Sequence, residues 1–423
     1  MINRVKQHYD VAVVGGGAAG MMAAIQAARQ GCNVVIVEYN DRLGRKLLAT
    51  GNGRCNFSNL IPELSNYRGA APDFVQTVYR QFDVDATMAF FRELGIEPIN
   101  KDGLLYPRSQ QASAVVEVLQ MELRLLQIAV IYSAPVKKVE RLDSCFSVVM
   151  TDKSMLTAQN VILATGGQAS AIRGSSGDGY YLARLLGHSI VTPMPALVQL
   201  HSNLSYLSTL TGVRTNACVT MTVDDAVVGS ECGELQWTEY GISGIVVFQL
   251  SRFASYALEA KQQVNCQIDF LPDITPQASL EDLKIRFWSH GYGKTTSEAL
   301  IGLLHDKVIA VLLDSCEIAA DMPADSCSME QLLQLHQRIH SFVVPINGTH
   351  GMKHAQVTAG GVDTVELNAD TMESRIVPGL FFAGELVDVD GICGGYNLQW
   401  AWSSGAVAGM HVKRTKYDSD QTT

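Results

Sequence analysis

The chain has 423 residues, a formal net charge of -10 and nine cysteines. A chain of this length is too long to fold around one ordinary hydrophobic core, so we expect two or three domains. The negative charge gives no general attraction to phosphate backbones or anionic lipid, so we expect neither nucleic acid nor a membrane as a partner. The cysteines never form a Cys-x-x-Cys pair, which disfavours zinc and is typical of a protein in the reducing cytoplasm.

The N-terminal segment 9–38 predicts a dinucleotide-binding unit. It has the pattern of a buried strand, a helix and a second strand, and the first turn carries Gly15, Gly17 and Gly20. Glycines at this spacing allow a tight turn, a close approach of the backbone to a pyrophosphate, and close packing of the helix on the sheet. Glu38 follows the second strand, where a carboxylate can accept hydrogen bonds from the ribose hydroxyls of an adenosine.

The remainder of the N-terminal part alternates between helical and strand patterns. A polar, Gly-rich loop at 39–66 precedes helical patterns at 74–94 and 112–127. The segment 133–151 alternates like a pair of exposed strands, and a short buried strand at 161–164 ends in Thr-Gly-Gly.

The middle of the chain predicts an insertion. Residues 191–275 are rich in Val, Thr and short apolar alternations, which is typical of a small β-domain, and residues 276–344 have helical patterns. After residue 344 the sequence again has the pattern of buried strands and glycine-rich turns. We therefore predict an α/β fold in which 1–190 and 345–423 form one discontinuous Rossmann-like nucleotide domain, interrupted by a cap with a β-rich part and a helical part.

Two segments near the C-terminus favour a flavin over a nicotinamide cofactor. Residues 378–385 form a turn and a short apolar strand ending in Gly384 and Glu385, and 391–399 begin a helix that runs to about Met410. An acid after the strand can bind a ribityl hydroxyl, and a helix N-terminus near the pyrimidine edge stabilises the negative charge of a reduced flavin. The predicted cofactor is therefore FAD, held by both ends of the chain.

Five motifs give the chain a close resemblance to a known family. They are the loop Gly-Arg-Lys-Leu-Leu-Ala-Thr-Gly-Asn-Gly-Arg-Cys-Asn at 44–56, then 164–167, 174–180, 356–362, and the tail from 383–385 to 397–399. With these motifs the chain resembles the BaiN/RdsA-type FAD-dependent oxidoreductases, also called aminoacetone-oxidase-family FAD-binding enzymes, over nearly its whole length. It is more distantly similar to the flavoprotein subunits of succinate dehydrogenase and fumarate reductase.

The resemblance implies an FAD-binding domain of the glutathione-reductase-like class in which FAD is bound non-covalently. It also implies which residues contact FAD. The turn that carries Gly15, Gly17 and Gly20, which we call the glycine cradle, would hold the pyrophosphate. Glu38 would bind the adenosine ribose, and the backbone of Val136 would contact the adenine. The 44–56 loop would contact the middle of the cofactor, and the tail would contact its flavin end. Cations in that loop suit a diphosphate, because they form charge-assisted hydrogen bonds. The implied contacts are Gly15, Gly17, Ala18, Ala19, Gly20, Glu38, Arg45, Lys46, Gly53, Arg54, Cys55, Asn56, Val136, Ala164, Thr165, Gly166, Gly384, Glu385, Asn397 and Leu398.

The sequence assigns no catalytic residue. Cys55 follows an arginine in a Gly-rich loop, but it has no cysteine partner nearby, and we interpret it as a small packed residue rather than a redox thiol. His350 and His354 precede the return to the nucleotide domain, where a histidine could deliver a proton, although most single histidines are structural. Relatives commonly carry a histidine in the cap where this chain has Glu239, beside Tyr240.

The predicted function is an FAD-dependent reductase of a small organic substrate, such as one with an activated carbon–carbon double bond. No second nucleotide cradle follows a strand and begins a helix, so NAD(P)H would be a transient electron donor that leaves before the substrate binds, with ping-pong kinetics. Two alternatives stay open. One is an amine or aminoketone oxidase that passes electrons to oxygen, and the other is an RNA-modifying or RNA-binding flavoprotein. The substrate and the oligomeric state are not predicted.

Overall fold

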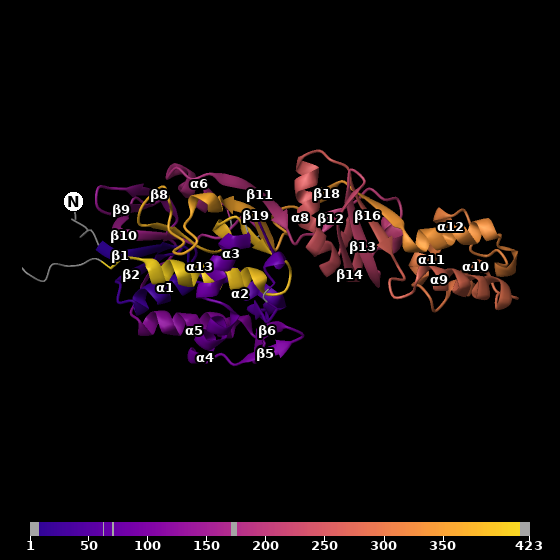
Figure 1. Ribbon diagram of the computed structural model, residues 1–423, viewed down its shortest axis with the longest axis horizontal. Helices are drawn as coiled ribbons and strands as arrows, with labels where there is room; N and C mark the ends of the chain where they lie inside the picture. The colour runs from indigo at the N-terminus through magenta and orange to yellow at the C-terminus, as the bar shows by residue number, and fades with distance from the viewer. Residues whose placement is uncertain (1–7, 62, 70–71, 171–175, 415–423) are drawn as a thin grey trace, which may run out of the picture. The chain divides into compact units, whose positions relative to one another are not determined.

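The protein is described here by a computed structural model that covers residues 8–61, 63–69, 72–170 and 176–414 (Figure 1). The first two residues of the 174–180 motif lie outside these described residues. The chain divides into two compact units. Unit 1 is Met1–Pro193 with Val357–Thr423, and unit 2 is Met194–Gln356.

Unit 1 is built on a seven-stranded sheet with the order β7-β2-β1-β10-β9-β8, in which β20 also pairs with β10. Five of these strands run parallel, namely β7, β2, β1, β10 and β20, while β9 and β8 form an antiparallel extension. Parallel strands need apolar side chains on both faces, which explains the uninterrupted apolar run of β1. The strands are β1 His8–Val14, β2 Val34–Val37, β7 Ala129–Ile131, β8 Val136–Arg141, β9 Phe146–Met150, β10 Met155–Leu163 and β20 Leu380–Phe382.

Smaller elements surround this sheet. Its helices are α1 Ala18–Arg29, α2 Arg45–Ala49, α3 Pro72–Gln81, α4 Val84–Glu93, α5 Ala112–Leu125, α6 Asp178–Leu185 and α13 Tyr396–His411, with 3-10 turns at Thr50–Gly53, Leu64–Asn66, Thr364–Glu366 and Gly384–Leu386. Its short strands are β3 Ser58–Asn59, β4 Tyr67–Gly69, β5 Pro98–Lys101, β6 Leu104–Pro107, β11 Ile190–Ala196, β19 Val357–Val362 and β21 Val389–Gly391. The predicted α/β class with a Rossmann-like domain is confirmed.

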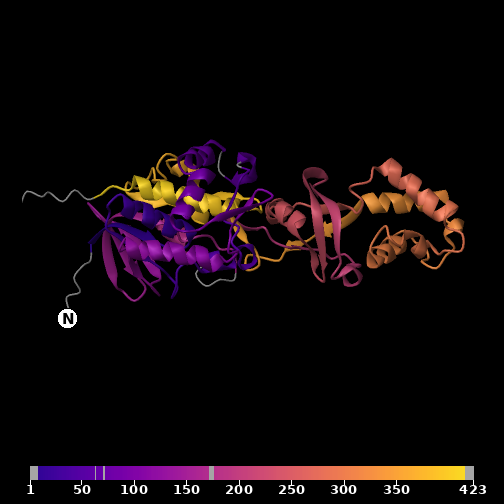
Figure 2. The ribbon, with the colours of Figure 1, turned by 90° about the horizontal axis from the view of Figure 1, so that it is seen from below.

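The first and last helices of the chain pack directly on each other. Figures 1 and 2 show the yellow C-terminal helix α13 alongside the indigo elements of the N-terminus. Two glycines of α13 make this approach possible, because a Cβ at Gly405 would lie 2.5 Å from the carbonyl oxygen of Ala19 and one at Gly409 would collide with that of Ala23. The two ends of the sequence therefore share one hydrophobic core.

Unit 2 contains a seven-stranded antiparallel sheet with the order β17-β16-β13-β14-β15-β12-β18. Its strands are β12 Leu200–His201, β13 Arg214–Val223, β14 Ala226–Thr238, β15 Gly241–Ser243, β16 Val264–Asp269, β17 Phe342–Ile346 and β18 Gly348–Thr349. Helix α8, Ile245–Glu259, packs on β13 and β14. Because β17 and β18 pair in this sheet, residues 345–356 belong to unit 2, whereas the sequence assigned them to the nucleotide domain.

The helical part of unit 2 shares a hydrophobic core with the sheet, to which Leu283, Leu312 and Leu335 contribute alongside Ile268 and Val344. Its helices are α7 Leu207–Leu210, α9 Pro276–Lys284, α10 Thr296–Leu300, α11 Asp306–Ser315 and α12 Met329–His340, with a π-helical turn at Ile285–Ser289 and a 3-10 turn at Ala324–Ser326.

Two of the nine cysteines form a disulfide in unit 2. Cys218 on β13 stands directly opposite Cys232 on β14, and their Sγ atoms are bonded. No local sequence pattern predicts this bond, because the partners are 14 residues apart and become neighbours only through the strand register.

Candidate cofactor site

The glycine cradle lies between β1 and α1, and its three glycines serve different purposes. Gly15 has a φ of +105°, and a Cβ there would lie 2.5 Å from the carbonyl oxygen of Ala164. A Cβ at Gly20 would collide with the carbonyl oxygen of Gly15. Gly17 differs from both, because a Cβ there would meet no atom within 4 Å. Packing therefore requires Gly15 and Gly20, while Gly17 borders open space into which a ligand can fit.

The N-terminus of α1 has the properties of an anion site. Gly17 is its N-cap, no side chain caps it, and its first turn holds no acidic residue. The first N–H groups of a helix have no partner within the helix, and they carry the positive end of the helix dipole. A pyrophosphate over Gly17 would satisfy these donors.

Glu38 follows β2 and is held beside the cradle. The residue is 6% exposed, and its Oε2 accepts a hydrogen bond from the backbone N–H of Gly16 at 2.6 Å. Oε1 accepts from the backbone and side-chain nitrogens of Asn40, both at 2.8 Å. The backbone N–H of Ala134, two residues before β8 begins at Val136, donates to the backbone carbonyl of Glu38 at 2.9 Å. A carboxylate has about four lone-pair sites, so capacity remains for ribose hydroxyls.

The predicted loop 44–56 leads into a segment that is bonded to the C-terminal helix. Ser58 Oγ donates to Gln399 Oε1 at 2.6 Å, and the indole Nε1 of Trp402 donates to the carbonyl of Phe57 at 2.9 Å. Helix α13 begins after Gly395, whose φ is +93°, again without a side-chain cap or an acidic first turn. The loop and α13 thus meet at a second uncapped helix N-terminus.

Glu385 joins several segments that are distant in sequence. Its Oε2 lies 2.5 Å from Nζ of Lys46, and its Oε1 accepts the backbone N–H of Thr358 at 2.8 Å. Thr358 Oγ1 in turn accepts the backbone N–H groups of Gln168 and Ala169 at 2.8 and 2.9 Å. The resemblance implied that Lys46 contacts the middle of the cofactor, but here its charge pairs with Glu385. Thr358 is not among the predicted contacts, although it lies in the 356–362 motif and bonds to Glu385.

Several of the predicted contact residues have polar atoms without a hydrogen-bond partner in the described part of the chain, or lie beside open space. Asn56 Oδ1 and Thr165 Oγ1 are buried and find no hydrogen-bond partner among the described residues, which is costly unless a ligand or water supplies a donor. A Cβ at Gly53 or at Gly166 would meet nothing within 4 Å. Together with the two uncapped helix termini, these features fit an extended flavin dinucleotide with its pyrophosphate and polyhydroxyl chain.

Other predicted residues form bonds within the protein. The Asn397 side-chain amide forms two hydrogen bonds with the backbone of Gly391. Oδ1 accepts from the Gly391 N–H and Nδ2 donates to the Gly391 carbonyl, both at 2.8 Å. Arg45 donates to the Asn40 side chain at 3.0 Å, and Arg54 is exposed. The remaining predicted contacts are Ala18 and Ala19 in the first turn of α1, Ala164 after β10, Gly384 beside Ala19, and Leu398 in the first turn of α13.

Cys55 is predicted to be chemically inert. It is fully buried, and burial raises the pKa of its thiol to about 12. At pH 8 only about one thiol in ten thousand would be a thiolate, the form that reacts. We therefore expect that a thiol-alkylating reagent leaves Cys55 unmodified in the native protein, as peptide mass mapping would detect. The Cys55→Ala variant should retain its flavin, and loss of flavin from it would contradict this packing role.

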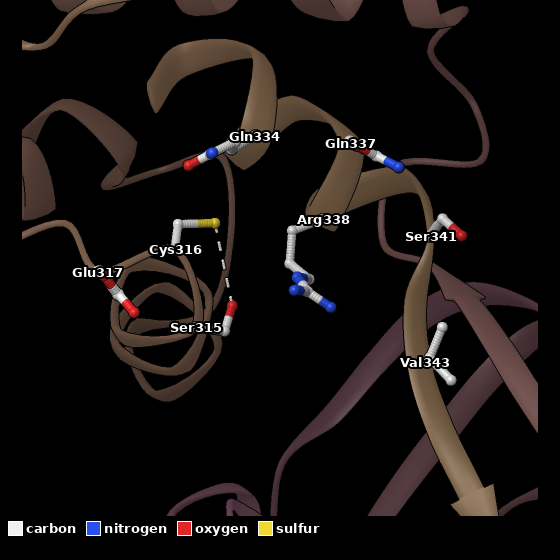
Figure 3. Close-up of a pocket in the computed structure, with 8 residues that line it drawn as sticks. All are labelled: Ser315, Cys316, Glu317, Gln334, Gln337, Arg338, Ser341 and Val343. Carbon is white, nitrogen blue, oxygen red and sulfur yellow. Dashed lines mark hydrogen bonds between the residues drawn. The ribbon is translucent and has the colours of Figure 1, made fainter. Parts of the chain in front are cut away.

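A separate cavity of about 470 Å³ lies in unit 2 between the end of α11, one face of α12 and the start of β17. Figure 3 shows that mostly polar side chains line it, with Arg338 pointing into it. It contains none of the predicted cofactor contacts. Among the residues that the structure describes, no group of three or more His, Cys, Asp or Glu side chains could hold a metal ion. No helix in the described ranges combines the length and apolar character needed to cross a bilayer.

Comparisons with known proteins agree with the predicted resemblance. The model of the HI0933-like protein Rossmann domain matches residues 9–411. The chain is 41% identical to a 3-dehydro-bile acid delta(4,6)-reductase of Clostridium scindens, over 94% of this chain and 98% of that protein. It is 30% identical to a ribosomal RNA dihydrouridine synthase of Haemophilus influenzae, over 97% of this chain and 100% of that protein.

A solved structure shows the same fold. The 3-ketosteroid delta1-dehydrogenase of Sterolibacterium denitrificans superposes with a TM-score of 0.50 at 12% identity, over 96% of this chain and 99% of that one. The family match spans most of the sequence, and two relatives reach 30% identity or more over nearly their whole length. The chain belongs to the HI0933-like family and is an FAD-dependent oxidoreductase.

Proposed function

We propose that the protein reduces an activated carbon–carbon double bond of a small organic substrate and takes its electrons from NAD(P)H. The observation that carries the proposal is the set of uncapped helix termini and unpartnered polar atoms in unit 1, which suits one flavin dinucleotide. The relative from Clostridium scindens is named as a delta(4,6)-reductase of a 3-dehydro-bile acid, which supports a conjugated ketone of the steroid type as the substrate.

FAD, when bound, supplies the two-electron chemistry that the side chains lack. In our proposal the residues of unit 1 hold it at three places. Gly17 and the N-terminus of α1 bind the pyrophosphate. Glu38 binds the adenosine ribose, and Asn56, Thr165 and the N-terminus of α13 face the other half of the cofactor.

The charges at the proposed flavin end favour a reduced, anionic cofactor. The N-terminus of α13 contributes partial positive charge, with no acidic residue in its first turn to oppose it. Glu385 would oppose it, but Lys46 pairs with this acid at 2.5 Å and offsets its charge. The Lys46–Glu385 pair therefore keeps an acid available for hydrogen bonding without adding net negative charge beside the flavin.

The two alternative functions make different demands on the molecule. An rRNA-modifying activity is named for a relative at 30% identity, but the net charge of -10 gives this chain no general attraction to RNA. An amine or aminoketone oxidase would use the same cofactor site but would need no pyridine nucleotide. Reduction by NAD(P)H therefore separates our proposal from the oxidase.

Anaerobic titration of the purified protein with NADH and NADPH tests the proposal. We expect one of them to bleach the flavin absorbance, and a steroid ketone with a conjugated double bond to restore it without oxygen. If neither nucleotide bleaches the flavin, the proposed function is wrong. Rapid oxygen uptake with an aminoketone in the absence of NADH would instead favour the oxidase, and RNA retained at moderate salt would favour the RNA-modifying function.

A further inference from the structure

Thr358, the second residue of β19, connects segments of unit 1 that are distant in sequence. Its Oγ1 accepts the backbone N–H groups of Gln168 and Ala169 at 2.8 and 2.9 Å. Its own backbone N–H donates to Glu385 Oε1 at 2.8 Å. The residue is 1% exposed, so water competes little for these bonds. One threonine therefore ties the segment after β10 to the 3-10 turn after β20.

These segments approach so closely that Gly167 has no room for a side chain. A Cβ at Gly167 would lie 2.4 Å from Thr358 Oγ1 and 2.9 Å from Glu385 Oε1. Atoms in a packed interior do not come that close, so any other residue would push the threonine and the acid away. The threonine hydroxyl and the acid thus lie against the same point of the turn that contains Gly167.

The positions of Thr358 and Glu385 are fixed from several sides. Glu385 follows β20, which pairs with β10 in the main sheet. At the other end of β19 the backbone N–H of Asp388 donates to the carbonyl of Val362 at 3.0 Å. Glu385 Oε2 lies 2.5 Å from Nζ of Lys46. Both oxygens of the acid therefore have a protein partner, one from β19 and one from α2.

The segments that Thr358 connects carry predicted cofactor contacts. Glu385 is a predicted contact of the flavin end, and the predicted contacts Thr165 and Gly166 directly precede the turn that the hydroxyl holds. Thr165 Oγ1 is buried with no hydrogen-bond partner among the described residues. A Cβ at Gly166 would meet no atom of the described chain within 4 Å. Thr358 therefore sets the spacing between Glu385 and the open space beside Gly166.

We propose that Thr358 is a positioning residue for the flavin half of FAD. The inference rests on the cofactor site of the proposed function. The Thr358 hydroxyl holds the turn at residues 166–169 and its backbone N–H holds Glu385, so the turn and the acid have one fixed spacing before FAD binds. A site that is already ordered loses less conformational entropy on binding, which strengthens binding. Thr358 takes no part in the redox chemistry, because it acts through the turn and the acid.

The Thr358→Val variant tests the hydroxyl, since it keeps the size and branching of the side chain. The backbone N–H groups of Gln168 and Ala169 lose their acceptor in this variant, so the turn no longer has one favoured position. We expect the dissociation constant for FAD to rise about 10- to 100-fold. We also expect the visible circular dichroism of FAD, measured at saturation, to change, because this signal reports the surroundings of the flavin.

Two further variants separate positioning from a general loss of stability. Thr358→Ser restores the hydroxyl, so we expect its affinity and its flavin signal to return close to those of the unaltered protein. Thr157→Val is the matched control, because it removes the hydroxyl of another buried threonine, near the start of β10, where Oγ1 lies 3.1 Å from His8 Nδ1. We expect this control to bind FAD with an unchanged signal. A purely structural role of Thr358 would lower the melting temperature without changing the signal of the bound flavin.

Hydrogen exchange tests the inference without a variant, and it decides the question even if Thr358→Val does not fold. We expect the amides of Gln168 and Ala169 to be protected already in protein that has been stripped of FAD, because the Thr358 hydroxyl is their acceptor. If these amides become protected only when FAD is added, the cofactor orders the turn and the inference is overturned.

The outcomes separate this inference from the proposed function. If the unaltered protein binds no FAD, the proposed cofactor site fails and the inference fails with it. If the protein binds FAD but neither nucleotide reduces it, the proposed function fails, while the affinity and flavin signal of Thr358→Val still test the inference. If Thr358→Val matches Thr157→Val in both measurements, the inference is overturned and the proposed function is unaffected.

Discussion

The Gly17→Val variant is expected to fold normally and to lose FAD. Gly17 has a φ of -79°, which any residue can adopt, and a Cβ there would meet no atom within 4 Å. The branched side chain would instead fill the space in front of the first N–H groups of α1, where the pyrophosphate is proposed to bind. We expect at least about a 100-fold weaker affinity, or roughly 2.7 kcal/mol. Flavin absorbance per protein and the melting temperature measure the two properties.

Gly20→Ala is the matched control for this variant. It adds one methyl group in the same turn, but that group would collide with the carbonyl of Gly15. We therefore expect it to lower stability as well as FAD content, whereas Gly17→Val lowers only FAD content. A Gly17→Val protein that binds FAD as tightly as the unaltered chain would show that the cradle does not hold the pyrophosphate.

The Trp402→Ala variant is expected to destabilise unit 1 by about 3–5 kcal/mol. The Trp402 side chain is fully buried, and its ring meets Phe91 edge-on with centroids 5.1 Å apart. Its indole N–H also donates to the carbonyl of Phe57, which would lose a buried partner. Chemical unfolding followed by circular dichroism measures the change.

The Trp402→Phe variant separates ring packing from the hydrogen bond. It keeps an aromatic ring against Phe91 but leaves the Phe57 carbonyl without its donor, so we expect a smaller loss of about 1–3 kcal/mol. Equal stability of Trp402→Ala and the unaltered protein would mean that the contact between α13 and residues 57–59 does not support the fold.

Local patterns in the sequence were sufficient to predict the strand, turn and helix that form the glycine cradle. The spacing of Gly15, Gly17 and Gly20 predicted the turn between β1 and α1. The alternation at 133–151 predicted the strands found as β8 and β9, but the prediction that both are exposed is wrong, because β9 is buried between β8 and β10. The helical pattern at 74–94 was read as one helix, but the structure has α3 and α4. Asp83 separates them, because its side chain accepts the N–H of Ala86 at 2.9 Å and caps a new helix.

Contacts between distant segments could not be predicted from the sequence. The bond between His201 and His350 joins residues 149 apart, and Thr358 acquires its role only because strand order brings Gln168 and Glu385 to it. No local pattern encodes these pairs. Lys46 shows the same limit, since its motif indicated a cation near the cofactor but not the acid that pairs with it.

The Lys46–Glu385 pair closes a loop of 339 residues, which has a consequence for synthesis on the ribosome. Every residue of unit 2 is made before β20 and α13, so unit 2 can complete its core while unit 1 still lacks the strand beside β10 and the helix that covers α1. Until then the nascent chain exposes an unpaired parallel strand and an apolar helix face, both prone to aggregation. In the proposed site the N-terminus of α13 faces one half of the cofactor, so this site is complete only after α13 has been made.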